Sequence, residues 1–142
     1  MSLRPDDSPG YLLWVVSLRW QRVMAATLAP LDLTHTQFVL LASAWWLGEH
    51  EEAPNQLRLA QHAGTDVRTT SQVLRSLEAK GLLERRVDAG DTRAKRVHVT
   101  PAGRALAPAA TAAVEAADRA FFAAAPEGDV LGLLRALAER DG

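Results

Sequence analysis

Cysteine is absent from this sequence of 142 residues. Its absence excludes disulfide bonds, thiolate metal sites and cysteine-based redox sensing, and it is typical of cytosolic proteins. Long apolar runs are also missing: segment 11–16 is short, and Arg19 and Arg22 interrupt its continuation, whereas a membrane helix needs about 20 apolar residues. Because Asp6 and Asp7 stand near the start and no apolar stretch leads to a cleavage site, we expect no signal peptide. The sequence therefore predicts a cytoplasmic protein without a membrane anchor.

Residue groups that carry out catalysis are missing too. The four histidines show no metal-ligand spacing, and there is no cysteine to complete a ligand set. The acidic residues Glu49, Glu51 and Glu52 have no nucleophile beside them, so we interpret them as a solvated loop. The glycine-containing segment 88–91 is a turn and not a phosphate cradle. We therefore expect that the protein is not an enzyme and that it binds neither a metal ion nor a cofactor.

The charge is small in total but unevenly distributed. The net charge is −1, which by itself argues against a general nucleic-acid binder. Residues 67–104 nevertheless hold nine basic and four acidic side chains, a net charge of +5, and the rest of the chain carries −6. A basic middle between acidic flanks is typical of a polyanion-binding site. A merely solvated surface can have the same composition, so charge alone leaves both interpretations open.

Two helices are predicted in the first third of the chain. Apolar residues spaced three and four apart predict a helix over about 10–29, which Pro30 ends. Thr34 and Gln37 form a capping box, in which the hydroxyl accepts from a backbone N–H and the amide reaches back. They begin a second helix that reaches about Gly48.

A tight pair of helices follows. Asn55 is a suitable N-cap for a short third helix, and Gly64 is a natural left-handed stop. Asp66 then caps a fourth helix, which ends at Gly81. Two short helices joined so closely predict a helix-turn-helix.

The last elements are a hairpin and two more helices. Residues 82–87 and 95–99 alternate in character around a turn and predict a β-hairpin. The pair Thr100-Pro101 begins an alanine-rich fifth helix, since a proline at the first helical position loses no hydrogen bond. Pro126 ends that helix, and a last helix covers about 127–139. The fold class is therefore mainly α with a small β-hairpin.

The predicted fourth helix has two different faces at 100° per residue. Its apolar face consists of Val67, Thr70, Val73, Leu74 and Leu77. Its polar face consists of Arg68, Gln72, Arg75, Ser76 and Ala79, with Thr69 and Ser71 at the margins. In the major groove, guanidinium groups pair with guanine and amides pair with adenine, so this face favours base reading. The same pattern occurs in amphipathic helices that bind no DNA.

The predicted hairpin is basic. Arg93 lies near its tip, and Lys95 and Arg96 lie on the returning strand. A thin hairpin with an arginine at its tip can reach phosphates or enter a narrow minor groove. Asp88 and Asp91 can orient the Arg93 guanidinium by charge-assisted hydrogen bonds. The alternative is that Asp91 and Arg93 only close the turn.

Five segments together carry a resemblance to a known family. They are QFVLL (37–41), NQLRLA (55–60), LRSLEAKGLLERR (74–86), DAGDTR (88–93) and VHVTPAG (97–103). Over roughly Leu31 to Leu106 the chain resembles the MarR family of bacterial transcriptional regulators. The resemblance implies a winged helix-turn-helix, a homodimer formed by the terminal helices, and a pseudo-palindromic operator of double-stranded DNA. It also implies repression that is relieved by a small aromatic or phenolic ligand.

The resemblance also implies roles by position. The residues that would contact DNA are Asn55, Gln56, Arg68, Thr69, Ser71, Gln72, Arg75, Arg93 and Lys95. Asn55 and Gln56 stand at the start of the third helix, where backbone N–H groups can meet a phosphate. Two positions depart from the family pattern. Gln72 stands where many relatives carry a basic residue, and this weakens any transfer of operator sequence. Arg58 stands where an acid is frequent.

The terminal helices predict a dimer. They are rich in alanine and leucine, and Leu131, Leu134 and Leu137 form a stripe on the last helix. A two-fold partner would place a second recognition helix about one DNA turn away. We therefore divide a single structural domain into a dimerisation helix (1–30), a winged DNA-binding unit (31–100) and dimerisation helices (101–142). The alternative is that these helices pack only within one chain.

A ligand pocket is predicted near the first two helices. The family places effector pockets where these helices meet the fifth, so the resemblance implies a lining of Tyr11, Trp14, His35 and Trp45. The aromatic rings could stack on a flat ligand. Tryptophans at helical spacing are also typical of cores and dimer contacts.

Two functions remain open from the sequence. The first is an operator-binding regulator, and the second is a winged-helix module that binds a protein through its hairpin. Arg68, Gln72, Arg75 and Arg93 together favour the first, because a protein-binding module has no need for them.

Overall fold

The computed structural model describes residues 4–88, 90–125 and 128–139, with the backbone alone for residue 88 and residues 91–94. It confirms a mainly helical fold with one two-stranded antiparallel sheet. In chain order the elements are the 3₁₀ helix η1 (Pro5–Asp7), α1 (Pro9–Leu28), the 3₁₀ helix η2 (Ala29–Leu31), α2 (His35–His50), α3 (Gln56–Ala63), α4 (Val67–Ala79), β1 (Leu83–Asp88), β2 (Asp91–Val99), α5 (Pro101–Phe122) and α6 (Val130–Ala138).

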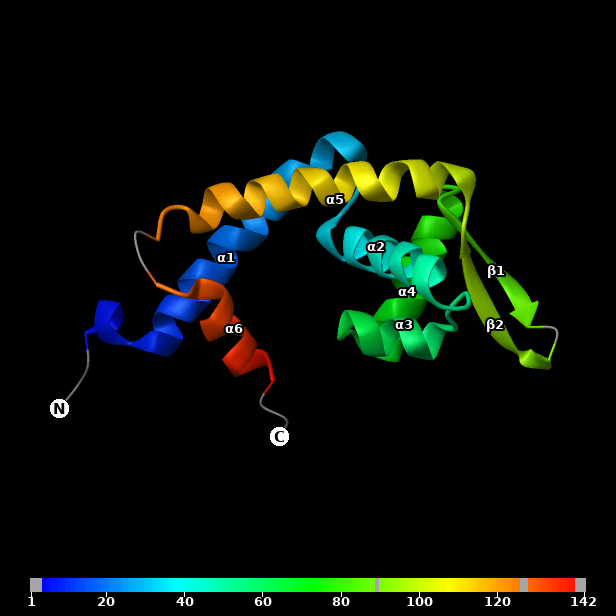
Figure 1. Cartoon of the computed structure of the whole chain (residues 1–142), viewed down its shortest axis with the longest axis horizontal. Helices are drawn as coiled ribbons and strands as arrows, with labels where there is room; N and C mark the ends of the chain where they lie inside the picture. The colour runs from blue at the N-terminus through cyan, green and yellow to red at the C-terminus, as the bar shows by residue number, and fades with distance from the viewer. Residues whose placement is uncertain (1–3, 89, 126–127, 140–142) are drawn as a thin grey trace.

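The long helix α5 joins two parts of the molecule (Figure 1). On one side lie α2, α3 and α4, with the hairpin β1–β2 extending from them. On the other side lie the first part of α1 and the whole of α6. The end of α1 and the start of α5 pack against the predicted DNA-binding unit, whereas the first part of α1 and α6 lie away from it.

Four helices begin at the caps that the sequence predicts. Each cap side chain accepts a hydrogen bond from the backbone N–H three residues later, and this satisfies one unpaired donor of the first turn. The distances are 3.1 Å at Thr34, 2.8 Å at Asn55, 2.7 Å at Asp66 and 3.1 Å at Thr100. These caps fix where α2, α3, α4 and α5 start.

Some bounds differ from the expected ones. Helix α1 ends at Leu28, just before Pro30 as expected, but the chain continues into the 3₁₀ helix η2, because a proline fits the first turn of such a helix. Asp32 then turns the chain with a left-handed φ of 56°. Helix α2 continues to His50, and β2 begins at Asp91, four residues earlier than expected. Pro126, expected to break the fifth helix, lies outside the described residues.

One core lies where the helices of the DNA-binding unit meet α1 and α5. Its larger, fully buried side chains come from five elements and are Met24, Leu28, Leu40, Leu41, Leu47, Leu59, Leu74, Leu77 and Val97. Alanines of α5 complete it and allow that helix to approach closely. Removing one of these leucines would leave a cavity at a cost of about 2–5 kcal/mol.

The base of the hairpin is fixed at two points. The backbone N–H of Val97 donates to the carbonyl of Pro54 at 2.8 Å, and Asn55 forms an isolated antiparallel β-bridge with Arg96, so the segment before α3 is tied to β2. Gly103 lies against the Leu82 carbonyl and the Val99 side chain so closely that a Cβ atom there would overlap both. The hairpin is therefore held between α3 and the start of α5.

Candidate nucleic-acid interface

Helix α4 packs one face into the core. Leu74, Leu77 and Thr70 are completely buried, as expected. The Thr70 hydroxyl donates to the Asp66 carbonyl at 2.8 Å, which satisfies this buried polar group. The prediction that Val67 belongs to the buried face is wrong, because Val67 is 55% exposed. It occupies the first turn of the helix, which extends beyond the core.

The opposite face of α4 carries exposed polar side chains. Arg68, Gln72 and Arg75 are all exposed. Within the part of the chain that the structure describes, no carboxylate pairs with Arg68 or Arg75, and Gln72 makes no side-chain hydrogen bond. Arg75 donates to the Ser71 hydroxyl at 3.4 Å, which extends the guanidinium along the helix. These groups are free to meet a ligand.

The first turn of α4 is rigid. The Asp66 carboxylate accepts from the Thr69 backbone N–H at 2.7 Å and from the Thr69 hydroxyl at 2.8 Å. The backbone hydrogen bond from Thr69 is the main reason that the pKa of Asp66 lies below its usual value. Since its hydroxyl proton is already given to Asp66, Thr69 can offer a nucleic acid only an acceptor unless this contact breaks.

A polar network holds α4 against its neighbours. The Gln56 amide donates to the carbonyl of Val67 at 3.4 Å and accepts from Arg85 at 3.5 Å. Arg85, which is mostly buried, forms an ion pair with Glu78 of α4. Gln56, a predicted DNA contact, therefore also links α3, α4 and β1.

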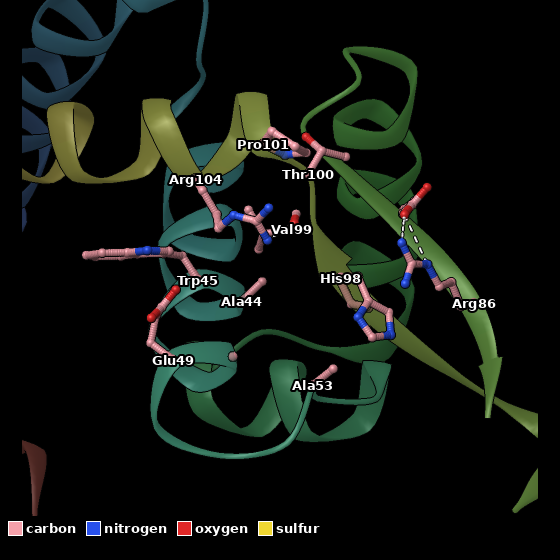
Figure 2. A pocket seen from close by; sticks show the side chains of 13 residues that line it. Ala44, Trp45, Glu49, Ala53, Arg86, His98, Val99, Thr100, Pro101 and Arg104 are labelled. Carbon is pink, nitrogen blue, oxygen red and sulfur yellow. Dashed lines mark hydrogen bonds and ion pairs between the residues drawn. The ribbon is translucent and has the colours of Figure 1, made fainter. Parts of the chain in front are cut away.

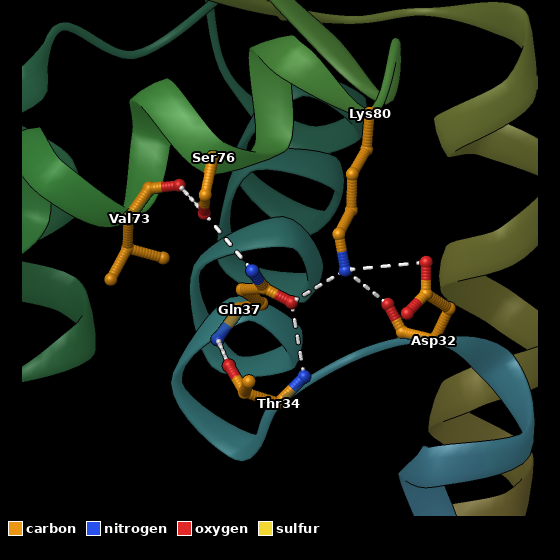
Figure 3. A network of polar contacts seen from close by, with 6 residues as sticks. All are labelled: Asp32, Thr34, Gln37, Val73, Ser76 and Lys80. Atoms are coloured by element: carbon orange, nitrogen blue, oxygen red, sulfur yellow. Dashed lines mark hydrogen bonds and ion pairs between the residues drawn. The ribbon is translucent and has the colours of Figure 1, made fainter.

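A second network joins α4 to the start of α2 (Figure 3). The capping box is complete, with Thr34 N–H donating to the Gln37 side chain at 3.0 Å. The Gln37 amide then donates to the Ser76 hydroxyl at 3.1 Å. Lys80 donates to Gln37 at 3.0 Å and contacts Asp32 through both its carbonyl and its carboxylate. Sequence reasoning found the capping box but missed this network, because nothing in the local pattern pairs residue 37 with residue 76.

Several basic side chains of the helix-turn-helix and the hairpin are paired with carboxylates. Arg86 pairs with Glu84, Arg58 with Glu51 at 3.1 Å, and Arg96 with Glu52 at 3.4 Å. The acidic residues Glu51 and Glu52 are therefore partners of α3 and β2 and not only a solvated loop. Arg58 does not add a free charge to α3. Arg68, Arg75 and Lys95 are exposed and have no carboxylate partner among the described residues.

The wing carries the remaining predicted contacts. Lys95 is exposed on β2, opposite Val87 of β1. The backbone of Arg93 belongs to β2, but its side chain lies outside the described residues, as do those of Asp88 and Asp91. At the start of α3, the side chain of Asn55 accepts from Arg58 N–H and thus acts as a helix cap.

Of the four residues predicted to line a ligand pocket, Trp45 lines the cavity at the hairpin base, and Tyr11, Trp14 and His35 do not line that cavity. Tyr11 and Trp14 are exposed on α1, with 49% and 64% of their surfaces accessible. His35 packs edge-on against Trp20 with ring centroids 5.0 Å apart. Burial lowers the pKa of His35, and Asp118 opposes this shift. Trp45 lies further along α2 and borders a different site.

Trp45 lines a cavity of about 360 Å³ between α2, the hairpin base and the start of α5 (Figure 2). Arg86, His98 and Arg104 also line it, and Arg104 donates to the Val99 carbonyl at 3.3 Å. No carboxylate pairs with Arg104 in the described ranges. Glu49 and Glu84 line the cavity as well, and Glu84 pairs with Arg86. The cavity therefore combines a flat aromatic ring with side chains of both charges.

The structure defines a class of protein. A helix-turn-helix whose second helix presents free arginine and glutamine side chains, followed by a basic wing, is the architecture of a DNA-binding regulator. Among the described residues no group of acidic and histidine side chains could hold a metal ion. In the same part of the chain, no helix has the length and apolar character needed to cross a bilayer.

Comparison with known proteins gives the family. Residues 33–95 match the model of the MarR family. The chain is 43% identical over 121 residues to the uncharacterized HTH-type transcriptional regulator YdcH of Bacillus subtilis, covering 85% of this chain and 82% of that protein. It is 35% identical to the HTH-type transcriptional repressor Rv2887 of Mycobacterium tuberculosis, covering 83% of each. The chain belongs to the MarR family of winged helix-turn-helix transcriptional regulators and is not an enzyme.

Solved structures agree with this assignment. The structure of CouR from Rhodococcus jostii RHA1 bound to p-coumaroyl-CoA matches with a TM-score of 0.82 and 29% identity, over 97% of this chain and 94% of that one. The transcriptional repressor CouR bound to a 23-mer DNA duplex matches with a TM-score of 0.81 and 25% identity, over 97% of each chain.

Proposed function

We propose that this regulator is a cytoplasmic repressor that binds a pseudo-palindromic operator as a homodimer and is released by a small aromatic ligand. The observation that carries the proposal is the outer face of α4. Arg68, Gln72 and Arg75 are exposed there without carboxylate partners among the described residues. Guanidinium and amide groups held on a rigid helix are suited to guanine and adenine edges in the major groove.

Contacts to phosphates complete the proposed interface. Lys95 is exposed on the wing, and Arg93 is close to it along β2. Backbone N–H groups at the start of α3, beside Asn55, provide a further phosphate contact. In this arrangement α4 selects the sequence, while the wing and α3 supply affinity that does not depend on sequence.

The apolar surface of α1 and α6 supports the homodimer. No described residue of α6 is buried, and Leu131, Leu134 and Leu137 are 57%, 42% and 54% exposed. Tyr11, Leu12, Leu13 and Trp14 are exposed on α1. Apolar patches of this kind on soluble chains mark interfaces. Residues 1–30 and 101–142 would form the dimer, and residues 31–100 would bind DNA.

An apolar groove provides a surface that the second subunit of the proposed dimer could cover. It has a volume of about 620 Å³ and lies between α1, α5 and α6, with Leu13, Trp20, Phe122 and Leu134 among its lining residues. A second copy of the chain related by a two-fold axis would cover this groove with its own α1, α5 and α6, and its groove would be covered in the same way.

The cavity beside Trp45 supports a flat ligand with an acidic group, because Arg104 has no carboxylate partner among the described residues, although Glu49 and Glu84 also line the cavity. Trp45 offers a stacking surface, and Arg104 and His98 offer donors for a carboxylate or phenolate. The relative CouR binds p-coumaroyl-CoA, an aromatic thioester. The lining first expected from Tyr11, Trp14 and His35 stays a prediction, since a dimer partner would change the surroundings of α1.

A gel-shift titration tests the function. The DNA upstream of the gene that encodes this protein is compared with random duplex at two salt concentrations. Tight, saturable binding to the upstream DNA above the control is expected, and an added aromatic acid should weaken it. Equal binding to both duplexes that vanishes with salt would contradict an operator at that position.

A further inference from the structure

A partly exposed apolar side chain stands at the N-terminal end of α4, beside the polar face of that helix. Val67 is the first residue of α4, directly before Arg68, and it is 55% exposed. By helical projection Val67 lies on the apolar side of α4, between Leu74 and Ser71, but the first turn extends beyond the core. The exposed part of this branched apolar side chain therefore gains nothing from the core of its own chain.

The backbone at Val67 is held in a fixed position. Its carbonyl accepts from the Gln56 amide at 3.4 Å, and Gln56 is itself contacted by Arg85. On the other side, Asp66 caps the helix through Thr69. A valine in a helix also has one strongly preferred side-chain rotamer. The two methyl groups are therefore exposed and aimed in one direction, with little entropy left to lose on contact.

The N-terminal residues of a recognition helix are those that reach base edges in the major groove. Only one group on these edges is apolar, the C5-methyl group of thymine. Every other group there is a donor or an acceptor that valine cannot satisfy. We infer that Val67 is a specificity-determining residue that selects a thymine in each half-site by contact with its C5-methyl group. This inference rests on the proposed function, because it requires that α4 enters the major groove.

Uracil provides a direct test, since it pairs like thymine but lacks the methyl group. A duplex is first enriched from a random pool by binding to the wild-type protein. Each thymine of that duplex is then replaced by uracil in turn, and affinities are measured by fluorescence anisotropy. At one thymine in each half-site, the wild-type protein should lose affinity about four-fold, the effect of removing one methyl group from an apolar contact.

The variant Val67→Ala should bind the thymine and uracil duplexes with equal affinity at that position. Val87→Ala is the matched control, because Val87 is 58% exposed and lies on the wing strand β1. The minor groove, which a wing can enter, presents no thymine methyl group. Val87→Ala should keep the four-fold difference, and circular dichroism checks that both variants fold.

Two other results would overturn the inference. If Val67→Ala loses the same affinity as the wild type at every uracil, another residue reads the methyl group. If no single thymine matters to the wild-type protein on an enriched duplex, no methyl group is read at all. A pool that the wild-type protein fails to enrich would instead overturn sequence-specific binding, and with it the proposed function.

Discussion

Gln37 and Ser76, which are 39 residues apart in sequence, are joined by a side-chain hydrogen bond of 3.1 Å (Figure 3). Gln37 belongs to the capping box of α2, and Ser76 lies on the recognition helix α4. Lys80, just after α4, contacts the same glutamine and Asp32 in the turn between α1 and α2. The turn between α1 and α2 and the recognition helix α4 are thus connected by one polar network.

Replacing Gln37 by alanine should therefore destabilise the protein. The change removes the hydrogen bond from Thr34 N–H to the Gln37 side chain. It also removes the hydrogen bonds that the same side chain forms with Ser76 and Lys80. We expect a loss of about 1–2 kcal/mol in the free energy of unfolding, measured in urea. Gln61→Ala is the matched control, because Gln61 is exposed on α3. A loss of the same size in both variants would mean that the network contributes nothing to stability.

Local rules were sufficient for the order of the elements. The capping residues Thr34, Asn55 and Asp66 predict where three helices begin, since Ser, Thr, Asp and Asn satisfy the first unpaired N–H groups of a helix. Contacts between distant segments could not be predicted in the same way. The isolated β-bridge between Asn55 and Arg96 involves a single residue before α3 and has no periodicity to detect.

The candidate site was predictable only in part. The amphipathic pattern placed Arg68, Gln72 and Arg75 on an exposed face, where the structure has them. It wrongly predicted that Val67 is buried, because a helical projection does not show how far the core extends along the axis. Ion pairs such as Arg58–Glu51 depend on loop geometry, so composition overstated the free positive charge.

Gln72→Ala should reduce affinity for the correct operator much more than for random DNA. Gln72 is exposed and uncommitted among the described residues, and an amide that reads adenine contributes about 1–3 kcal/mol of discrimination. Isothermal titration on both duplexes measures the difference, and Gln61→Ala serves as the control on α3. Equal losses on the two duplexes would show that Gln72 reads no base.

Arg93→Ala should weaken binding to every DNA sequence. The resemblance to the MarR family implies that this wing residue contacts a phosphate or the minor groove. Each lost phosphate contact lowers the slope of log affinity against log salt by about 0.9. Arg135→Ala on α6 is a control on the other side of the molecule. An unchanged affinity and slope for Arg93→Ala would remove this residue from the interface.

Leu134→Asp should convert the dimer into monomers. Leu134 is 42% exposed and lines the groove between α1, α5 and α6. A carboxylate buried there without a partner would cost several kcal/mol of association free energy. Analytical ultracentrifugation gives the mass, and Leu57→Asp, an equally simple change at an exposed leucine of α3, should leave the mass unchanged. A dimer that survives Leu134→Asp would place the interface elsewhere.

Mild acid should destabilise the protein through His35. Burial beside Trp20 lowers the pKa of His35 in the folded chain, although the nearby Asp118 carboxylate opposes the shift. The unfolded chain therefore binds a proton first as the pH falls below the ordinary histidine value of about 6.5. Stability is complete above that value and is lost progressively between it and the lower folded pKa.

The melting temperature is measured by circular dichroism at pH 7.5 and at pH 5.5. We expect the wild-type protein to melt at a lower temperature at pH 5.5, and His35→Gln to show a smaller difference, because glutamine takes up no proton. The control variant His98→Gln keeps His35, so the part of the decrease in melting temperature at pH 5.5 that is due to His35 should remain. If His35→Gln loses as much as the wild type on acidification, protonation of His35 does not oppose folding, and the contact with Trp20 tolerates the charged ring.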